Sequence, residues 1–482
     1  MTSFEILSHA AKYGIEYRNK VKTKSPYPVS DANGLRRLFD IALPDKGRPA
    51  VDVINQLVHS SEQGLVGSTG DAFFGWVMGA SNTVGIAADW LTSAWGQNSA
   101  IYQTAPSAAI AEEVAGKWLI DLLKLPAESS VAFTTGATMA SFISLAAARG
   151  EVLRRHCWDL EAQGMFSAPE VKVYVSEEAH SSIFAVLRYL GFGHERLIRV
   201  AAIEDGAMSV ADLEARLQDG GGPSIIIAQA GHINTGACDD FKAISSLAKK
   251  ANAWLHIDGA FGLWAQSSAK LSYLCDGVDK ADSWAVDGHK WIQVPYDSGY
   301  AIIKDKTAHC RAMATTAGYL NETVEDGRNP THFAPELSRR ARGFTVWAVL
   351  QHLGRQGISK IVEGNVYNAR QLATHLKRAK GIRVLHKVYL NQLAVMFEDD
   401  FGPSSDLTLK VVTTLQEENR WFVKEAEWRG KTILRISFSS ATKTEAQIQD
   451  IAGDIVRIWQ DIRATKTALK IVPMEALDIS PL

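Results

Sequence analysis

The sequence contains little cysteine. Only four cysteines occur among 482 residues, and they are scattered, with no CxxC pair and no metal-ligand spacing. A disulfide-stapled secreted fold and a cysteine-based metal site are therefore not expected, and a reduced cytoplasmic protein is the simplest interpretation. The four are Cys157, Cys238, Cys275 and Cys310.

An excess of positive charge is also missing. Lys and Arg total 51 against 53 Asp and Glu, which gives a formal net charge of −2. Nucleic acids and anionic membrane surfaces attract cationic proteins, so neither is expected as a partner. No apolar run reaches the ~18 residues that a membrane-spanning helix needs. The N-terminal segment carries acidic residues and lacks the apolar run of a secretory signal.

The chain is longer than one hydrophobic core usually serves, and its pattern changes twice. Residues 1–88 predict an N-terminal arm that buries little without a partner surface. Residues 89–365 alternate short apolar runs with amphipathic helices and predict a large domain. Residues 366–482 predict a smaller C-terminal α+β domain.

The short apolar runs of the large domain are expected to be strands of one sheet. Strands that alternate with helices predict an α/β fold, with a mostly parallel central sheet and helices on both faces. Ligands bind at the carboxyl ends of the strands in such sheets. The expected strands are Val131–Thr135, Val171–Val175, Leu197–Val200, Ser224–Ala228, Trp254–Asp258, Ser283–Val286 and Tyr300–Ile303.

A lysine follows one of these strands. Lys290 stands between His289 and Trp291, where partial desolvation would leave its amine uncharged and free to attack a carbonyl. The alternative is a lysine whose stem packs on Trp291 and whose ammonium group reaches solvent.

An aspartate ends another strand. Asp258 closes an apolar run, where a carboxylate needs a partner, and Gly259 and Ala260 leave room for a flat ring. One alternative is a structural aspartate that caps a loop. A second is an HxD metal pair with His256, for which no third ligand is evident.

Three further strand ends carry polar residues. Gly136 allows a tight turn into a helix, whose free N–H groups and the Thr138 hydroxyl form an anion site. His180 is placed to stack on a ring or to transfer a proton, and Asn234 or Thr235 to hydrogen-bond a ring oxygen. An ordinary helix cap, a packed histidine and a polar turn are the alternatives.

Together these residues suit pyridoxal 5′-phosphate (PLP). An amine bonds its aldehyde, a carboxylate keeps its pyridine nitrogen protonated, and a helix N-terminus holds its phosphate. Each signal is weak alone, and their occurrence at successive strand ends predicts a PLP enzyme.

Two longer motifs carry a family resemblance. They are Trp254-Leu-His-Ile-Asp-Gly-Ala-Phe-Gly and Gly288-His-Lys-Trp, the latter with Asp282-Ser upstream. On these the chain resembles the pyridoxal-dependent (group II) decarboxylases of the aromatic-L-amino-acid, glutamate and histidine decarboxylase group. The resemblance runs from about residue 65 to residue 437. It implies the aspartate-aminotransferase-like fold of PLP-dependent transferases, known as fold type I.

The resemblance also implies roles for individual positions. Lys290 would form the Schiff base, Asp258 would pair with the pyridine nitrogen, and His180 would stack on the ring. These three would be the catalytic residues, and the cofactor is expected to be PLP. The remaining cofactor contacts would be Ala260 at the ring, Asn234 near the phenolic oxygen, and Ala137, Thr138 and His289 at the phosphate. Family members are homodimers with shared active sites, in which the N-terminal segment wraps the partner.

The sequence departs from the family pattern at two places. Members often carry a Tyr in the loop before an Arg-Arg pair, and that Tyr protonates the carbanion left after CO₂ departs. The corresponding stretch here, Pro330–His332, contains no Tyr, so His180, His332 or Tyr319 is expected to act instead. In relatives, loss of the Tyr can redirect the reaction toward O₂ and an aldehyde. In addition, Asp287 replaces the usual Asn.

We therefore expect a lyase that decarboxylates an L-amino acid. The alternatives that keep PLP are aldehyde-forming oxidative deamination, an aldolase or lyase reaction, and amino transfer; a non-catalytic homologue is a further alternative. An apolar or aromatic substrate would be bound by side chains that could equally belong to the core. These are Phe73, Phe74, Trp76, Trp95, Tyr102 and His332.

Overall fold

The computed structural model describes residues 2–218, 221–315, 327–440 and 442–471, with side chains to residue 465. The chain divides into two compact units, which we call the sheet unit and the terminal unit. The sheet unit comprises 77–369 and 386–392, and the terminal unit comprises 1–76, 370–385 and 393–482. The expected three-part division at residues 88 and 365 stays a prediction.

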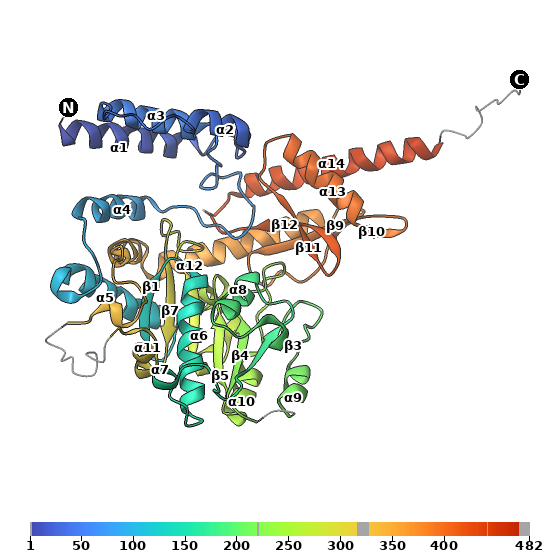
Figure 1. Cartoon of the computed structure of the whole chain (residues 1–482). Coiled ribbons are helices and arrows are strands. Elements are labelled where there is room, and N and C mark those ends of the chain that lie inside the picture. The colour runs from blue at the N-terminus through green and yellow to red at the C-terminus, as the bar shows by residue number, and fades with distance from the viewer. Residues whose placement is uncertain (1, 219–220, 316–326, 441, 472–482) are drawn as a thin grey trace, which may run out of the picture. The chain divides into compact units, whose positions relative to one another are not determined.

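The sheet unit is built on a seven-stranded sheet with the order β1-β7-β6-β5-β4-β2-β3 (Figure 1). The neighbours among β2 to β6 are parallel, and β7 is antiparallel to both β6 and β1. The mostly parallel sheet expected from the sequence is therefore confirmed. Its strands are β1 (Ser130–Thr134), β2 (Lys172–Ser176), β3 (Ile198–Val200), β4 (Ser224–Gln229), β5 (Trp254–Asp258), β6 (Ser283–Asp287) and β7 (Gly299–Ile303).

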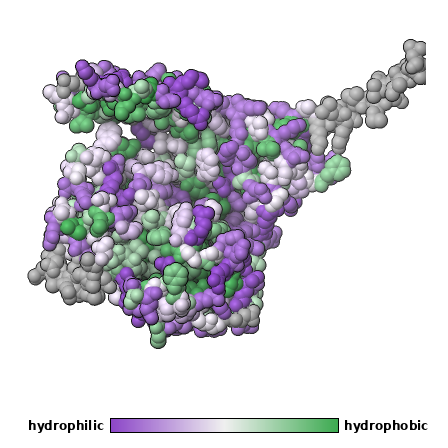
Figure 2. Space-filling view, viewed as in Figure 1, coloured by the Kyte–Doolittle hydropathy of each residue, from purple (hydrophilic) through white to green (hydrophobic). Residues whose placement is uncertain are grey.

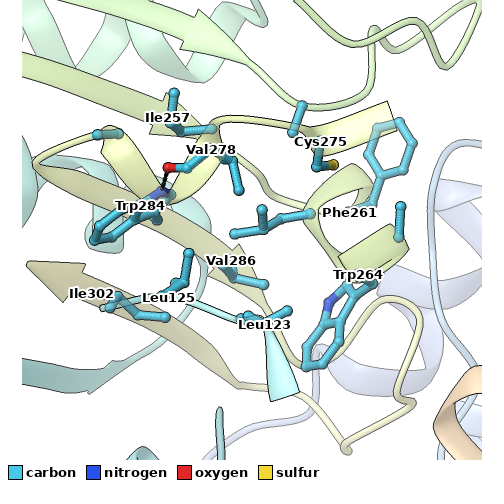
Figure 3. Packing of buried hydrophobic residues seen from close by; sticks show 14 of the residues in the cluster. Leu123, Leu125, Ile257, Phe261, Trp264, Cys275, Val278, Trp284, Val286 and Ile302 are labelled. Atoms are coloured by element: carbon cyan, nitrogen blue, oxygen red, sulfur yellow. Dashed lines mark hydrogen bonds between the residues drawn. The ribbon is translucent and has the colours of Figure 1, made fainter. Parts of the chain in front are cut away.

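Successive residues of these strands alternate between two hydrophobic clusters. Ile226 and Ile257 belong to one cluster, whereas Ile225 and Ile227 belong to the other. Both faces of the sheet are thus buried, which is why the strands read as nearly continuous apolar runs. Figure 3 shows the first cluster, where the indole Nε1 of Trp284 donates to the Val278 carbonyl at 2.9 Å.

Helices cover the two faces of the sheet. The Ala-rich helix α6 contributes Ala140, Ile143 and Ala147 to one cluster, and α5 and α10 contribute Leu119 and Ile244 to the other. The helices of the sheet unit are α4 (Thr83–Trp95), α5 (Pro106–Leu122), α6 (Ala137–Arg154), α7 (Leu160–Gln163), α8 (Ser181–Tyr189), α9 (Val210–Gln218), α10 (Phe241–Lys250), α11 (Lys306–Met313) and the first part of α12 (Arg342–Leu376).

The terminal unit holds a second sheet with the order β10-β9-β12-β11, in which β8 also pairs with β9. Its strands are β8 (Ile382–Val384), β9 (Gln392–Asp399), β10 (Gly402–Ser404), β11 (Lys424–Trp428) and β12 (Lys431–Ser437). Its helices are α1 (Ser3–Lys20), α2 (Ala32–Phe39), α3 (Ala50–Glu62), α13 (Ser405–Glu417), α14 (Glu445–Ile471) and the end of α12.

The N-terminal helices α1 to α3 bury almost nothing. Ser60 is the single buried residue among them. Large apolar side chains are exposed instead, including Phe4 at 76% and Leu7 at 67%, and Figure 2 shows apolar residues gathered on these helices.

Among the described residues, no helix is both long enough and apolar enough to cross a membrane.

Candidate active site

The residues expected to carry chemistry gather at one edge of the central sheet. Strands β2, β4, β5 and β6 run parallel, and β1 shares their direction because both β1 and β6 are antiparallel to β7. Their carboxyl ends therefore meet at one edge. Gly136, His180, Asn234, Asp258 and Lys290 each lie at or just after one of these ends.

Asp258 is a buried carboxylate at the end of β5. Burial raises the pKa of its carboxyl, and the opposing charges of His180 and Lys290 lower it in part. The backbone N–H of Ala260 donates to its Oδ1 at 3.2 Å. A carboxylate in this setting gains most from a cationic partner, because a buried ion pair is weakly screened.

Lys290 is held close to a second carboxylate. Its Nζ lies 3.0 Å from Oδ2 of Asp287, and its side chain is 20% exposed. Its Nζ also lies 5.9 Å from the centre of the Phe261 ring. The backbone around Lys290 is tightly packed, since a Cβ on Gly79 would lie 2.0 Å from the Lys290 carbonyl oxygen.

The turn from β1 into α6 is equally crowded. A Cβ on Gly136 would lie 3.1 Å from Cε1 of His289 and 3.3 Å from Oδ1 of Asp287. A Cβ on Gly299 would lie 2.4 Å from the Gly136 Cα. Only glycine lets these backbones approach, so the turn brings the start of α6 next to His289.

The start of α6 is the expected anion site. The N–H of Ala137, its first residue, donates to Oδ1 of Asp287 at 2.6 Å, and His289 Nε2 lies 3.3 Å from the same oxygen. Thr138 is exposed at this end of the helix. His289 stacks on Tyr296 with ring centres 4.3 Å apart, and burial lowers the pKa of the His289 imidazole.

His180 is oriented by its neighbours. It is the N-cap of α8, and its Nδ1 lies 2.7 Å from Oγ of Ser182. Its backbone N–H donates to Oε1 of Gln229, the last residue of β4, at 3.3 Å. The imidazole is thus fixed between the ends of β2 and β4, and its charge reaches Asp258.

Asn234 and Thr235, the two candidates for a contact with the ring oxygen, both lie in the loop after β4 but differ in their hydrogen bonds. Oγ1 of Thr235 donates to the Asp205 carbonyl at 2.7 Å and accepts from the Ala237 N–H at 3.1 Å. The Thr235 hydroxyl is therefore hydrogen-bonded to its own loop and to the segment between β3 and α9. Asn234 is buried in the same loop and stays the predicted contact.

The expected substrate-pocket residues are distributed over both units. In the terminal unit, Phe73 stacks on Phe422 with ring centres 4.5 Å apart, Phe74 packs edge-on against Phe438, and Trp76 is 45% exposed.

In the sheet unit, Trp95 is 51% exposed and packs edge-on against Phe344. The Tyr102 N–H donates to Oδ1 of Asn329, and His332 is buried in the short helix at 330–332. Tyr319, the other expected proton donor, lies outside the described residues.

The basic segment near residue 340 is structural. Arg339 is fully buried, where it pairs with Glu112 at 2.8 Å and donates to the Phe133 carbonyl at 2.8 Å. Arg340 pairs with Asp89 at 2.7 Å. These guanidinium groups hold the segment on α4, α5 and β1.

His256 is buried and hydrogen-bonded within the central sheet. Its Nδ1 lies 2.9 Å from Oγ of Ser283, and burial lowers the pKa of its imidazole to about 3. Within the described ranges, no group of three or more His, Cys, Asp or Glu residues could hold a metal ion.

Two site residues, Gln229 and Tyr296, were missed from the sequence, and for Asp287 only the departure from the family motif was noted and not its contacts. Asp287 contacts both Lys290 and α6, Gln229 receives the His180 N–H, and Tyr296 stacks on His289. The position of Asp287 and Gln229 as the last residues of β6 and β4 was an available signal. For Tyr296, which lies in an irregular segment, the sequence offers none.

The arrangement fits PLP. A lysine amine, a buried carboxylate with a raised pKa and a helix N-terminus with an exposed threonine converge on one edge of the sheet. These groups match the aldehyde, the ring nitrogen and the phosphate of the cofactor. Fold and site together therefore define a PLP-dependent enzyme.

Comparison with known proteins identifies the family. Residues 33–398 match the pyridoxal-dependent decarboxylase conserved domain, so the chain belongs to the pyridoxal-dependent decarboxylase family. Its cofactor is PLP and its activity is that of an amino-acid decarboxylase, a lyase. The expected family and enzyme class are thus confirmed.

Individual relatives differ in the substrates that they are named for. The aromatic-L-amino-acid decarboxylase of Bacillus atrophaeus is 26% identical over 454 residues, covering 90% of this chain and 91% of the relative. The L-2,4-diaminobutyrate decarboxylase of Rhizobium meliloti is 29% identical over 342 residues, covering 68% of this chain and 66% of the relative.

Solved structures share the fold. Oryza sativa TDC with PLP and tryptamine superimposes with a TM-score of 0.88 at 20% identity, covering 96% of this chain and 99% of that one. Rhodiola rosea 4-hydroxyphenylacetaldehyde synthase gives a TM-score of 0.85 at 18% identity, with the same coverage. The expected fold class is confirmed.

Proposed function

We propose that this chain removes the α-carboxyl group of an aromatic or apolar L-amino acid at the site formed by Lys290, Asp258 and His180. The observation that carries the proposal is the buried Asp258 carboxylate, which faces Lys290 and His180 at the carboxyl edge of the sheet. When bound, PLP supplies an electron sink for the electron pair left by the departing carboxyl group.

The chain's own residues would bind the cofactor and orient the substrate. Lys290 would hold the cofactor through its amine. Asp258 would keep the ring nitrogen protonated, and burial would strengthen that ion pair. His180, fixed by Ser182 and Gln229, would contact the ring and would return a proton to the α-carbon of the substrate.

The remaining contacts position the cofactor. Ala260 is small enough to lie against the ring, and Asn234 donates to the phenolic oxygen. Ala137, Thr138 and His289 bind the phosphate at the start of α6. His332 is a second candidate proton donor.

The proposed substrate class has two supports. One is the relative from Bacillus atrophaeus, which is named for aromatic amino acids and matches 90% of this chain. The other is the exposed surface of Trp95 in the sheet unit, which leaves apolar area for a ligand. The other proposed pocket residues are Phe73, Phe74, Trp76, Tyr102 and His332.

A second outcome is favoured by one observation. The stretch 330–332 forms a buried short helix without a tyrosine, so the carbanion lacks the usual proton donor at that place. Without that proton the substrate would be oxidised instead, so that one amino acid, one O₂ and one water would give CO₂, an aldehyde, ammonia and hydrogen peroxide. Rhodiola rosea 4-hydroxyphenylacetaldehyde synthase shares the fold.

Product analysis separates these outcomes. The purified enzyme is incubated in air with a panel of amino acids, and CO₂, amine, aldehyde and peroxide are measured. CO₂ with an equal amount of amine supports decarboxylation, and CO₂ with aldehyde and peroxide supports the oxidative outcome. Consumption of substrate without CO₂ would rule out both, and a Lys290→Ala variant is the inactive control.

We further propose that the chain is a cytoplasmic homodimer with three parts: an arm at 1–88, a large domain at 89–365 and a small domain at 366–482. The exposed apolar side chains of α1 to α3 support an arm that wraps a second copy. The four cysteines are free thiols, as expected in a reducing compartment. Light scattering measures the mass, and cell fractionation the location.

A further inference from the structure

A carboxylate occupies the anion site at the start of α6. Oδ1 of Asp287 accepts the N–H of Ala137 at 2.6 Å. The N-cap of this helix is Gly136, which has no side chain to supply a cap. Asp287, at the end of β6, therefore caps α6 from another element, as a phosphate would.

The same carboxylate also binds the amine assigned to the cofactor. Its Oδ2 lies 3.0 Å from Nζ of Lys290, and its Oδ1 lies 3.3 Å from Nε2 of His289. Asp287 is only 3% exposed, so water does little to screen its charge. One buried anion thus bridges the helix N-terminus and the lysine.

The groups around Asp287 supply little positive charge that could neutralise a second anion. Burial lowers the pKa of His289 and keeps its imidazole neutral, and it raises the pKa of Tyr296 to about 12, so that phenol is neutral too. Two anions that share one buried site repel each other strongly. The titratable groups that face Asp287 are Lys290, His289, Asp258, Tyr296 and Tyr300.

We propose that Asp287 is a placeholder anion, which caps α6 and holds Lys290 in the cofactor-free chain and releases the Ala137 N–H to the cofactor phosphate. Release is coupled to the uptake of one proton from solvent by the carboxylate–phosphate pair. The proposal rests on the proposed function. Because of this proton uptake, the phosphate's contribution to cofactor binding weakens as pH rises.

The test isolates the phosphate by comparing PLP with pyridoxal, which lacks it. Dissociation constants of both are measured by absorbance on the full chain after cofactor removal, from about pH 7 to about pH 9, where the free phosphate is a dianion. The ratio of the pyridoxal constant to the PLP constant reports the phosphate contribution. One-proton coupling lowers this ratio about tenfold per pH unit.

The variant Asp287→Asn removes the charge and offers an amide that donates to the phosphate. We expect its ratio to be at least about tenfold higher than that of the wild type near pH 8 and to be independent of pH. The matched control is Asp282→Asn, a partly buried aspartate, which accepts the Leu255 N–H at 2.8 Å and should keep the wild-type ratio.

The outcomes distinguish the two proposals. Equal ratios and equal pH slopes in wild type and Asp287→Asn would overturn the proposal that Asp287 is a placeholder anion. The proposed function would not be affected by that result. Binding of neither PLP nor pyridoxal to the wild type would overturn the proposed function. If Asp287→Asn does not fold, Asp287→Ser takes its place, and a wild-type ratio that does not change with pH overturns the placeholder by itself.

Discussion

At the scale of residues, burial decides the chemistry of the site. Asp258 and Asp287 both end strands of the same sheet, yet they have different neighbours. The charges of Lys290 and His180 act on Asp258, whereas Asp287 directly contacts Lys290 and the start of α6. Asp258 is proposed to hold the ring nitrogen, and Asp287 binds the start of a helix and an amine.

The role of Asp258 is tested by Asp258→Asn. A neutral amide does not keep the ring nitrogen protonated, so we expect kcat to fall by at least about 100-fold. The cofactor should remain bound, because Lys290 and the phosphate site are unchanged, and visible absorbance checks this. An unchanged kcat in a PLP-loaded variant would remove Asp258 from the mechanism.

Sequence reasoning found some of these residues and missed others for a physical reason. Lys290 and Asp258 could be predicted because an ionisable residue after an apolar strand is unusual. The contact of Asp287 with Ala137 could not, since it joins positions 150 residues apart and depends on how the end of β6 packs against α6.

At the scale of elements, short apolar runs predicted the strands of the central sheet to within about one residue at each end. The antiparallel direction of β7 was not predictable, because direction depends on the connection and not on the strand. Strand β11 carries no comparable signal, because its sequence, Lys-Glu-Ala-Glu-Trp, has little apolar character; it forms by pairing with β12.

The crowded turn between β1 and α6 is tested by Gly299→Ala. The added Cβ would meet the Gly136 backbone at 2.4 Å, so we expect a loss of about 1–3 kcal/mol in unfolding free energy and weaker PLP binding. Gly453→Ala in α14 is the control, since its Cβ meets open space. Equal stability of the two variants would mean that the turn relaxes freely.

Buried histidines predict acid sensitivity. Burial lowers the pKa of His256, in β5, to about 3, whereas an unfolded histidine titrates near 6.5. Between these values the unfolded chain binds a proton that the folded chain does not, so stability is full above about pH 6.5 and is lost as pH falls toward 3.

Urea unfolding of His256→Asn from about pH 7 to about pH 5 measures this. We expect the variant to lose stability on acidification more slowly than the wild type, by up to about 1.4 kcal/mol per pH unit. His309, whose pKa burial also lowers to about 3, is common to both chains and cancels in the comparison. Parallel pH profiles would contradict the buried, neutral state of His256.

At the scale of the whole molecule, the N-terminal helices suggest a second copy of the chain. Phe4 and Leu7 are exposed on α1, and the double variant Phe4→Glu, Leu7→Glu should weaken the proposed dimer by at least about tenfold in dissociation constant. Lys12→Glu, a charge change elsewhere on α1, is the control. Dimers of unchanged stability, measured by analytical ultracentrifugation, would place the interface elsewhere.

The proposed function depends on PLP bound to the ε-amino group of Lys290. Borohydride reduction of the purified enzyme, followed by proteolysis and mass spectrometry, locates this bond. We expect a reduced pyridoxyl group on the peptide that contains Lys290 and none on the corresponding peptide from Lys290→Ala. A PLP-saturated enzyme in which the label falls on another lysine, or on no lysine, would show that Lys290 does not bind the cofactor.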